Sequence, residues 1–523
     1  GTSGGSRQPA GGAPYRRLHE RELVFPRESP TFADTHEYIF RHALLHDVTY
    51  ESVLKRLRRR YHKQVADWLS ARSDWRTGEQ AGRIAEHYER AEAYDEAAAW
   101  HVRAGKQAKD IFALEAAVEH YTCALDLIAR SRTAGEEARR QRVDSYEGLG
   151  DVLHWLGRYT EAIEAFTEMV TEAESAGDIA AQARGWCGIA NARLEQGELH
   201  ALIESAERAE SLATQAGGGI ESIRAVRLRG AGLFRTGDIP GAESCAELAV
   251  QLGEQMQASR ELASSYNLLG VVNASQGRFE EGGRYFERAL ALLDKLGDRA
   301  GAIPLLNNLG VLAESKGDYE LALARYSEAL ENARKMGNRS GEMLYLSNVG
   351  AAQNMLGDYA AAEQSLREVI RMADTAGAGG LSATYANLAQ ACLAQGGADA
   401  ALDAAQYALA LADHADSREE EGFAWRILGQ IAAHKGEDVM LAYGRAGKPR
   451  PYSARDCFAR SADVYEELGI PGERARTLRD WAEYELHGGD PERGEALWEQ
   501  AWQTFAELGA EAELERMRSI RPL

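Results

Sequence analysis

The chain contains little proline, few cysteines and no long apolar run. Its 11 prolines in 523 residues, with Ala, Glu, Leu and Arg dominant, favour helices over sheets. The five cysteines lie far apart and form no CxxC pair, which argues against a disulfide framework or a zinc ribbon and favours a reducing, cytoplasmic setting. No apolar run approaches the ~20 residues of a membrane-spanning helix, and no signal peptide is recognisable.

Positive charge is also scarce relative to negative charge. Sixty Lys and Arg residues face 81 Asp and Glu residues, which gives a net charge of −21. An acidic chain is a poor general binder of nucleic acid, because phosphates repel it. The same charge disfavours self-association, so we expect a monomer. Local patches can still take basic or polar ligands.

A pair of small residues, the second always glycine, recurs at a nearly constant spacing. The two members lie seven residues apart, and successive pairs are 39 or 40 residues apart. Such a period indicates a repeat array in place of one compact core. The first members are Gly150, Ala190, Gly230, Gly270, Gly310, Gly350, Ala389 and Gly429, and the second are Gly157, Gly197, Gly237, Gly277, Gly317, Gly357, Gly396 and Gly436.

Each repeat predicts a pair of helices. A bulky apolar residue precedes the small residue, for example Gly310, by four positions, so both lie on one helix face. The small residue lets a second helix approach closely, and the later glycine, Gly317, ends the first helix in a left-handed cap. The second helix shows small, bulky and small residues at Ala322, Tyr326 and Ala329. These hairpins can bury their apolar faces only by stacking.

The segment NNLGVLAESKGDYELALARYSEAL, residues 307–330, is similar to the signature of the tetratricopeptide repeat (TPR). The resemblance covers roughly residues 79–508. A period of 40 resembles the long-helix variety found in bacterial regulatory ATPases, kinesin light chains and cell-polarity adaptors. The resemblance implies an all-α fold, a right-handed TPR superhelix. One unit departs from the pattern, because its second helix arrives late, after an insertion at about 437–449. We interpret the insertion as a loop or a helix extension; the alternative is a protruding contact element with Arg445, Lys448 and Arg450.

Residues 15–70 do not fit the repeat. The runs ELVF and EYIF predict a short β-hairpin, and a helix is predicted from about His42 to Leu69, with three more at about 79–91, 94–109 and 112–130. We expect a flexible tail or cloning scar at 1–14 and a winged-helix-like junction at 15–70. A helical lead-in should follow at 71–135, and a TPR array of about nine units at 136–523.

The junction carries a second resemblance. The segment EYIFRHALLHDVTYESVLKRLRRRYHKQVADWL, residues 37–69, resembles the winged-helix segment of bacterial STAND-type signalling ATPases, where it lies between the nucleotide-binding core and a TPR sensor. This resemblance implies an upstream ATPase that the present chain lacks. The sequence contains no GxxxxGK[ST] phosphate loop, so we expect no ATP hydrolysis by this chain alone.

Catalytic and metal-binding patterns are weak. His42 and His46 have the i, i+4 spacing of metal ligands, but no third ligand is evident, and the junction pattern accounts for both. There is no HExxH or GxSxG motif. We therefore predict no enzyme activity, catalytic residues, metal or cofactor. The basic run at 55–63 is interpreted as a solvated or interdomain face in preference to a nucleic-acid site. Aromatic residues such as Trp186, Trp425 and Tyr266 are interpreted as core.

In TPR arrays the first helix of each hairpin lines the inner groove. We define the groove stripe by helical spacing as the positions three before, one after and four after the small residue. These positions are rich in amides, which can pair with a peptide backbone as both donor and acceptor. The alternatives are solvated polar groups or an Asn ladder that stabilises the array. With one further arginine, the candidate ligand-contacting residues are Asn191, Arg224, Arg227, Asn267, Asn307, Glu314, Ser347, Asn354, Gln390 and Arg426.

Three functions remain open from the sequence. The first is the sensor arm of a STAND-type ATPase, in which a peptide, a protein or a small-molecule inducer occupies the groove and an ATPase domain precedes the arm in the same polypeptide. The second is a stand-alone TPR adaptor, which has no reason to carry the junction at 37–69. The third is a transcription regulator with a DNA-binding element beyond either end. We expect no nucleic-acid or membrane partner for this segment.

Overall fold

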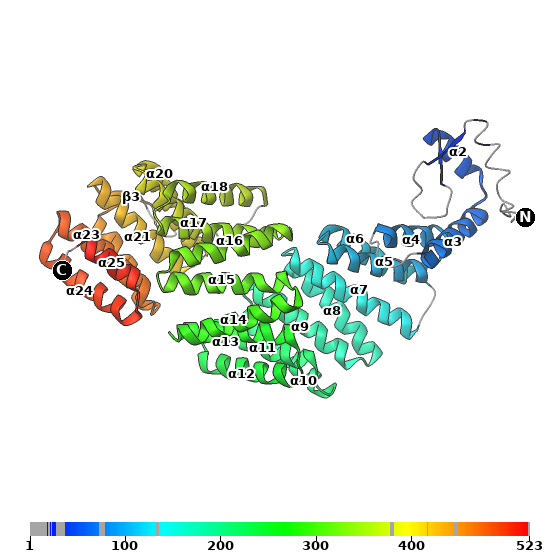
Figure 1. Cartoon of the computed structure of the whole chain (residues 1–523), viewed down its shortest axis with the longest axis horizontal. Helices are drawn as coiled ribbons and strands as arrows, with labels where there is room; N and C mark the ends of the chain where they lie inside the picture. The colour runs from blue at the N-terminus through cyan, green and yellow to red at the C-terminus, as the bar shows by residue number, and fades with distance from the viewer. Residues whose placement is uncertain are drawn as a thin grey trace, which may run out of the picture. The chain divides into compact units, whose positions relative to one another are not determined.

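The computed structural model describes Leu18, Arg21 and residues 23–27, 37–72, 79–131, 135–376, 381–415, 417–443 and 448–520, and these are overwhelmingly helical (Figure 1). The predicted tail at 1–14 lies outside the described residues. The chain divides into two compact units, Gly1–Val152 and Leu153–Leu523. Among the described residues, no helix has both the length and the hydropathy needed to cross a membrane.

The first unit begins with the predicted β-hairpin. Strand β1 (Val24–Pro26) pairs antiparallel with β2 (Tyr38–Phe40), so that Val24 lies opposite Phe40. The helices that follow are α2 (Ala43–Ser52), α3 (Lys55–Arg72), α4 (Glu79–Arg90), α5 (Tyr94–Asp110), α6 (Leu114–Arg130) and α7 (Glu136–Trp155), the last of which ends beyond the unit boundary. The β-hairpin confirms the one predicted from the two short apolar runs, and α4, α5 and α6 confirm the three helices predicted at about 79–91, 94–109 and 112–130.

The single helix predicted from His42 to Leu69 is wrong, because the structure divides it into α2 and α3. Val53 takes an extended conformation (φ −79°, ψ 131°), and its N–H bonds to the Tyr50 carbonyl. A β-branched side chain loses rotamer freedom in a helix, so ending the helix at a valine sacrifices little helix stability. The next helix starts at once, since the Arg58 N–H bonds to the Leu54 carbonyl over 3.0 Å.

The second unit is an array of helix hairpins stacked in chain order (Figure 1). After α8 (Tyr159–Ala176), the first helices of the hairpins are α9 (Ile179–Gln196), α11 (Ile220–Thr236), α13 (Ser259–Ser275), α15 (Arg299–Ser315), α17 (Arg339–Met355), α19 (Ser382–Ala394), α21 (Arg418–Lys435) and α23 (Pro471–Gly488). The second helices are α10 (Leu199–Gln215), α12 (Ile239–Gln255), α14 (Phe279–Leu296), α16 (Tyr319–Lys335), α18 (Tyr359–Ala376), α20 (Ala398–Ala415), α22 (Ala454–Glu467) and α24 (Pro491–Leu508). The final helix is α25 (Glu511–Ile520).

Both predicted roles of the small residues are confirmed. Gly317, which follows α15, has a φ of +79°, a left-handed conformation that favours glycine. Gly310 lies against the ring of Tyr326, and a Cβ placed on Gly310 would come within 2.5 Å of that ring. Gly270 makes the same close approach to Phe286, at 2.5 Å. The spacing in the sequence therefore sets how near the two helices of a hairpin lie.

The insertion after α21 forms a second β-hairpin, where a loop or a helix extension was predicted. Strand β3 (Val439–Leu441) pairs antiparallel with β4 (Arg450–Tyr452). Both ends of β3 and Tyr452 are buried, so the hairpin packs onto the array. Of the basic residues considered as contacts, Arg445 lies outside the described residues, Lys448 is exposed, and the Arg450 Nε donates to the Tyr452 hydroxyl over 2.5 Å.

Candidate functional site

The predicted ligand-contacting residues all lie on first helices of the second unit. Asn354 and Arg426 are buried, and the other eight are partly buried. By helix, they are Asn191 on α9, Arg224 and Arg227 on α11, Asn267 on α13, Asn307 and Glu314 on α15, Ser347 and Asn354 on α17, Gln390 on α19 and Arg426 on α21.

Amide side chains link successive first helices. The Asn308 amide donates to the Asn267 side-chain oxygen over 2.8 Å, and the Asn348 amide repeats the bond to Asn307 over 2.8 Å. This is the geometry of an Asn ladder. Within the described parts of the chain, the amide nitrogens of Asn267 and Asn307 donate no hydrogen bond. Each of these two residues thus stabilises the array with its oxygen and keeps its donor for another partner.

Two arginines one helical turn apart on α11 differ in their partners. Arg224 donates to Glu261 on α13 over 2.7 Å, and its side chain is 42% exposed. Arg227 makes no hydrogen bond or ion pair within the part of the chain that the structure describes. Burial, and then the adjacent Arg224, lower the pKa of Arg227. Glu261 attracts Arg227 electrostatically but forms no ion pair with it. Among the described residues, Arg227 is therefore a partly desolvated cation with no direct ion-pair partner, and an anionic or carbonyl group can satisfy it.

Further along the array, charged positions of the groove stripe are engaged within the chain. Arg426 donates to Glu473 on α23 over 2.8 Å. Burial alone would raise the pKa of Glu473, but the charges of Arg476 and Arg426 hold this pKa at about 2. Glu314 accepts from the Tyr326 hydroxyl over 2.9 Å, and burial raises its pKa. These residues contribute to an internal charge network.

Two buried acceptors lie between these regions. The Asn354 amide nitrogen donates to the Asn387 carbonyl over 2.8 Å, but its side-chain oxygen is buried and accepts no hydrogen bond from any described residue. The side-chain oxygen of Gln390 is also buried and accepts no hydrogen bond from any described residue. A buried acceptor of this kind is costly unless water or a ligand supplies a donor.

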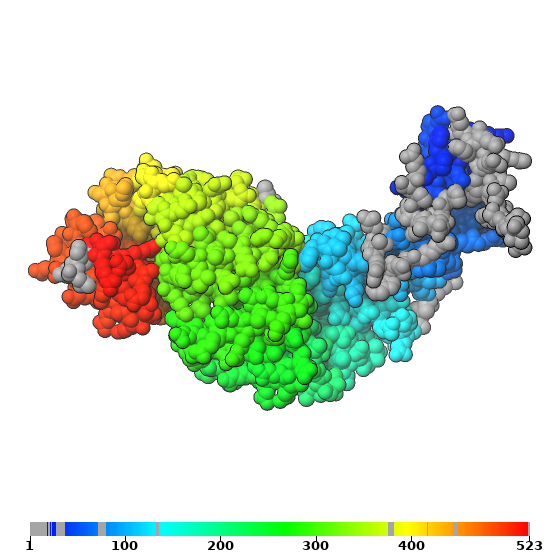
Figure 2. Space-filling model, viewed as in Figure 1, coloured from blue at the N-terminus to red at the C-terminus, as the bar shows by residue number. Residues whose placement is uncertain are grey.

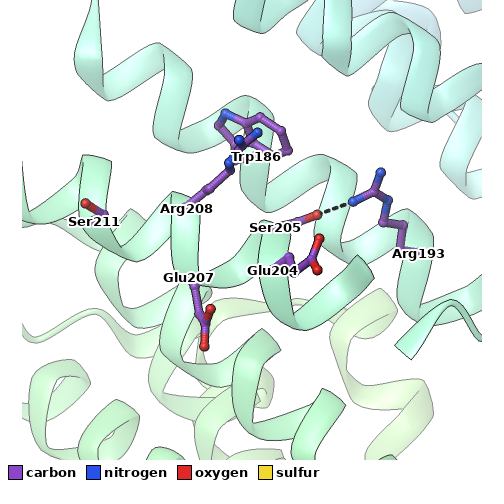
Figure 3. Close-up of a pocket in the computed structure, with 7 residues that line it drawn as sticks. All are labelled: Trp186, Arg193, Glu204, Ser205, Glu207, Arg208 and Ser211. Atoms are coloured by element: carbon purple, nitrogen blue, oxygen red, sulfur yellow. Dashed lines mark hydrogen bonds between the residues drawn. The ribbon is translucent and has the colours of Figure 1, made fainter. Parts of the chain in front are cut away.

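Two pockets lie on the second unit away from the arginine pair. One, of about 690 Å³, opens beside the groove-stripe residues Leu393, Gln430 and Ala433 and is also lined by Asp480 and Tyr484. Another, of about 560 Å³, lies on the hairpin of α9 and α10 (Figure 3). Figure 3 shows the Arg208 side chain reaching to Trp186, with the guanidinium 4.7 Å from the ring centroid, and Arg193 bonded to Ser205.

The aromatic residues interpreted as core fall into two groups. Trp425 and Tyr266 are buried, as predicted. Trp186 packs against the core of its hairpin but is only partly buried, and it also lines the pocket of Figure 3. The position of Trp186 in the repeat could not show whether it is a core residue or a pocket residue, because it contacts the core and the pocket at once.

In the first unit, the basic run of α3 is paired with acidic residues of its surroundings. Arg58 bonds to Glu51 over 3.2 Å and Lys63 to Glu96 over 2.9 Å. His46 hydrogen-bonds to Asp47 over 2.9 Å. No cluster of three metal-ligating side chains occurs in the residues that are described.

Comparisons with known proteins identify the kind of array. Residues 261–335 match the tetratricopeptide repeat family. No curated protein sequence matches the chain. A Rap protein crystallised with competence and sporulation factor is 15% identical and superposes with a TM-score of 0.53, over 72% of this chain and 100% of that one. Apo RapI is 13% identical, with a TM-score of 0.51 over 71% of this chain and 98% of that one. A STAND protein with a tetratricopeptide repeat sensor from Pyrococcus horikoshii is 14% identical. It has a TM-score of 0.45, over 75% of this chain and 56% of that one.

The fold is therefore a TPR array, a class of helical repeat that generally serves as a scaffold for protein interaction.

Proposed function

We propose that the second unit binds a peptide, or an extended segment of a protein, along the groove stripe of α9, α11 and α13. The observation that carries the proposal is Arg227, a partly desolvated cation that forms no ion pair or hydrogen bond with any described residue, on the face where the first helices present Asn191 and Asn267. A peptide supplies what this face lacks, because its carbonyls and carboxylates accept hydrogen bonds from arginine and amide donors.

A relative of the same fold adds support. The Rap protein that superposes on this chain was crystallised with competence and sporulation factor. The Asn ladder adds to this, because it fixes the orientation of each amide before a ligand arrives. Fixed donors reduce the entropy that binding must overcome.

The proposal is tested with a library of random linear peptides displayed on phage. We expect the selected peptides to be enriched in acidic residues. Their affinity should fall at least ~10-fold for Arg227→Ala, because a charge-assisted hydrogen bond contributes about 1.5–3 kcal/mol. Arg288→Ala is the matched control, since Arg288 is an exposed arginine on a second helix. Equal binding to all three proteins would contradict the proposal.

We further propose that this array is the sensor arm of a STAND-type ATPase. The support is the segment at 37–69, which resembles the junction between an ATPase core and its sensor. A stand-alone adaptor has no reason to carry such a junction. Binding of the ligand would act by favouring one of two arrangements of the arm and the core, which requires different affinities for the two.

The mass of the native polypeptide separates these functions. An immunoblot of the source cells should detect a product well above the 57.2 kDa of this chain. Removal of the array from that product should change its basal ATPase activity. A native product near 57.2 kDa leaves no room for an ATPase core and would favour the adaptor.

A further inference from the structure

The last helix of the chain contacts two hairpins that lie far away in the sequence. The Tyr319 hydroxyl, at the start of α16, donates to Glu513 of α25 over 3.0 Å, across 194 residues of chain. A Cβ placed on Gly317 would lie 2.7 Å from the Ala512 Cβ. Arg516 donates to the Met355 carbonyl at the end of α17, and its guanidinium lies 5.1 Å from the centroid of the Tyr319 ring. Figure 2 shows the C-terminal segment, in red, beside the green middle of the array.

Three donors from two distant hairpins converge on the Glu513 carboxylate. Arg476 Nε donates to Oε1 over 2.9 Å, Arg479 donates to Oε2, and Tyr319 donates to Oε1. The carboxylate is almost fully buried, with the residue 1% exposed. Burial would raise its pKa, but Arg479 and Arg476 hold it at about 2. This is a built carboxylate site, with two guanidinium groups and one hydroxyl arranged around a desolvated anion.

The helix α25 has two faces with different chemistry. Its apolar face, with Leu514 and Met517, covers the last hairpin, where Trp498 Nε1 donates to the Met517 carbonyl over 3.2 Å. That face alone suffices to cap a solenoid. Its other face, with Glu513 and Arg516, makes polar contacts to α16 and α17. A helix that only caps the last hairpin does not need polar contacts to two hairpins elsewhere in the array.

The carboxylate site is continuous with the groove stripe. Arg476 also bonds to Glu473, which accepts from Arg426, a groove-stripe residue of α21. Arg479 also bonds to Asp480 over 2.7 Å, and Asp480 accepts from Gln430 over 2.6 Å. The two arginines that hold Glu513 therefore also fix the charged and amide groups at this end of the groove.

We propose that Tyr319, Arg476 and Arg479 form a carboxylate-binding site whose ligand is the chain's own helix α25, and that reversible docking of α25 closes this half of the array. Release of Glu513 frees α16 and α17 from the last hairpin and leaves two arginines open to another carboxylate. The polar character of the contact suits a reversible latch, whereas the apolar face keeps α25 attached to α24 in both states. The latch goes beyond the peptide-binding function and does not depend on it.

Hydrogen–deuterium exchange on the whole chain tests the latch. Glu513→Gln should speed exchange in the segments 315–321 and 511–520 at least ~10-fold, because it removes hydrogen bonds to a charged group. Glu515→Gln is the matched control, since Glu515 is an exposed glutamate of the same helix and, among the described residues, pairs with Arg518 alone. Tyr319→Phe, which leaves all charges in place, should speed exchange in the same two segments without affecting α23.

Chemical rescue tests the nature of the site. In Glu513→Ala, acetate should restore slow exchange at 315–321, and an equal concentration of chloride should not, because only a carboxylate can take hydrogen bonds from both arginines. The proposal is overturned if Tyr319→Phe has no effect, if exchange rises equally throughout α23 and α24, or if acetate and chloride act alike. Each of these results would make Glu513 a structural part of the last hairpin only.

Discussion

Replacement of Trp425 by alanine is expected to lower the free energy of unfolding by about 3–5 kcal/mol, the usual cost of truncating a large buried aromatic side chain. Trp425 is fully buried on α21, and its ring centroid lies 5.2 Å from that of Tyr443 and 5.2 Å from that of Tyr452. The guanidinium of Arg460 lies 5.1 Å from the Trp425 centroid. Truncation therefore removes core packing, aromatic contacts and a cation–π contact together.

The same substitution should detach the β3–β4 hairpin, because the rings that anchor it lose their central partner. The measurement is the thermal midpoint together with limited proteolysis at 437–452. Met440→Ala is the control, since Met440 is 53% exposed on β3 and should leave both unchanged. A Trp425→Ala protein with a wild-type midpoint and an uncleaved hairpin would show that this cluster does not anchor the insertion.

Replacement of Glu485 by alanine should cost about 2–3 kcal/mol, because it removes hydrogen bonds to a buried charged acceptor and leaves the buried Trp481 N–H without its partner. Its carboxylate is fully buried on α23 and accepts two bonds of 2.7 Å from Arg455, one of 3.0 Å from Trp481 Nε1 and one of 2.8 Å from the Asp490 N–H. Urea unfolding measures the loss. Glu483→Ala, an exposed carboxylate on the same helix, should change stability by less than ~0.5 kcal/mol.

The Glu485 interaction also predicts a pH dependence. Burial opposes ionisation, but the Arg455 and Asp490 hydrogen bonds outweigh it and lower the pKa of Glu485 from its ordinary 4.5. A carboxyl with a lowered folded-state pKa contributes stability above its unfolded pKa and loses it as the pH falls through the folded value. Wild-type stability should therefore fall below about pH 4.5, and Glu485→Gln should show a shallower fall. Parallel acid transitions in the two proteins would contradict this assignment.

The repeat could be predicted from the sequence because its determinants are local. Gly310 and Gly317 each act within one hairpin, through a close approach to Tyr326 and through a left-handed cap. Local residue patterns also predicted the N-terminal β-hairpin and helices α4, α5 and α6. It failed at Val53, where one extended residue interrupts an otherwise continuous apolar pattern. It also missed β3 and β4, because β4 is the segment RPY, whose central proline has no N–H and is unusual in a strand.

The partners of most candidate residues could not be predicted, because they come from other hairpins. Arg224 and Arg227 look alike in the sequence, but within the described residues only Arg224 hydrogen-bonds to Glu261 on the neighbouring first helix. Arg426 is at a regular groove-stripe position, yet its partner Glu473 is 47 residues away. The bond between Tyr319 and Glu513 spans 194 residues, and no periodic pattern relates the two. Long-range pairing therefore decides which groove residues stay available to a ligand.

The most direct test of the account is the hydrogen–deuterium exchange footprint of a peptide selected from the displayed library, bound to the whole chain. Binding along the groove stripe predicts slower exchange in the first helices α9, α11 and α13, with no change in the second helices α10, α12 and α14. Protection confined to the second helices, or to the first unit, would contradict the claim that the groove stripe is the ligand-binding face.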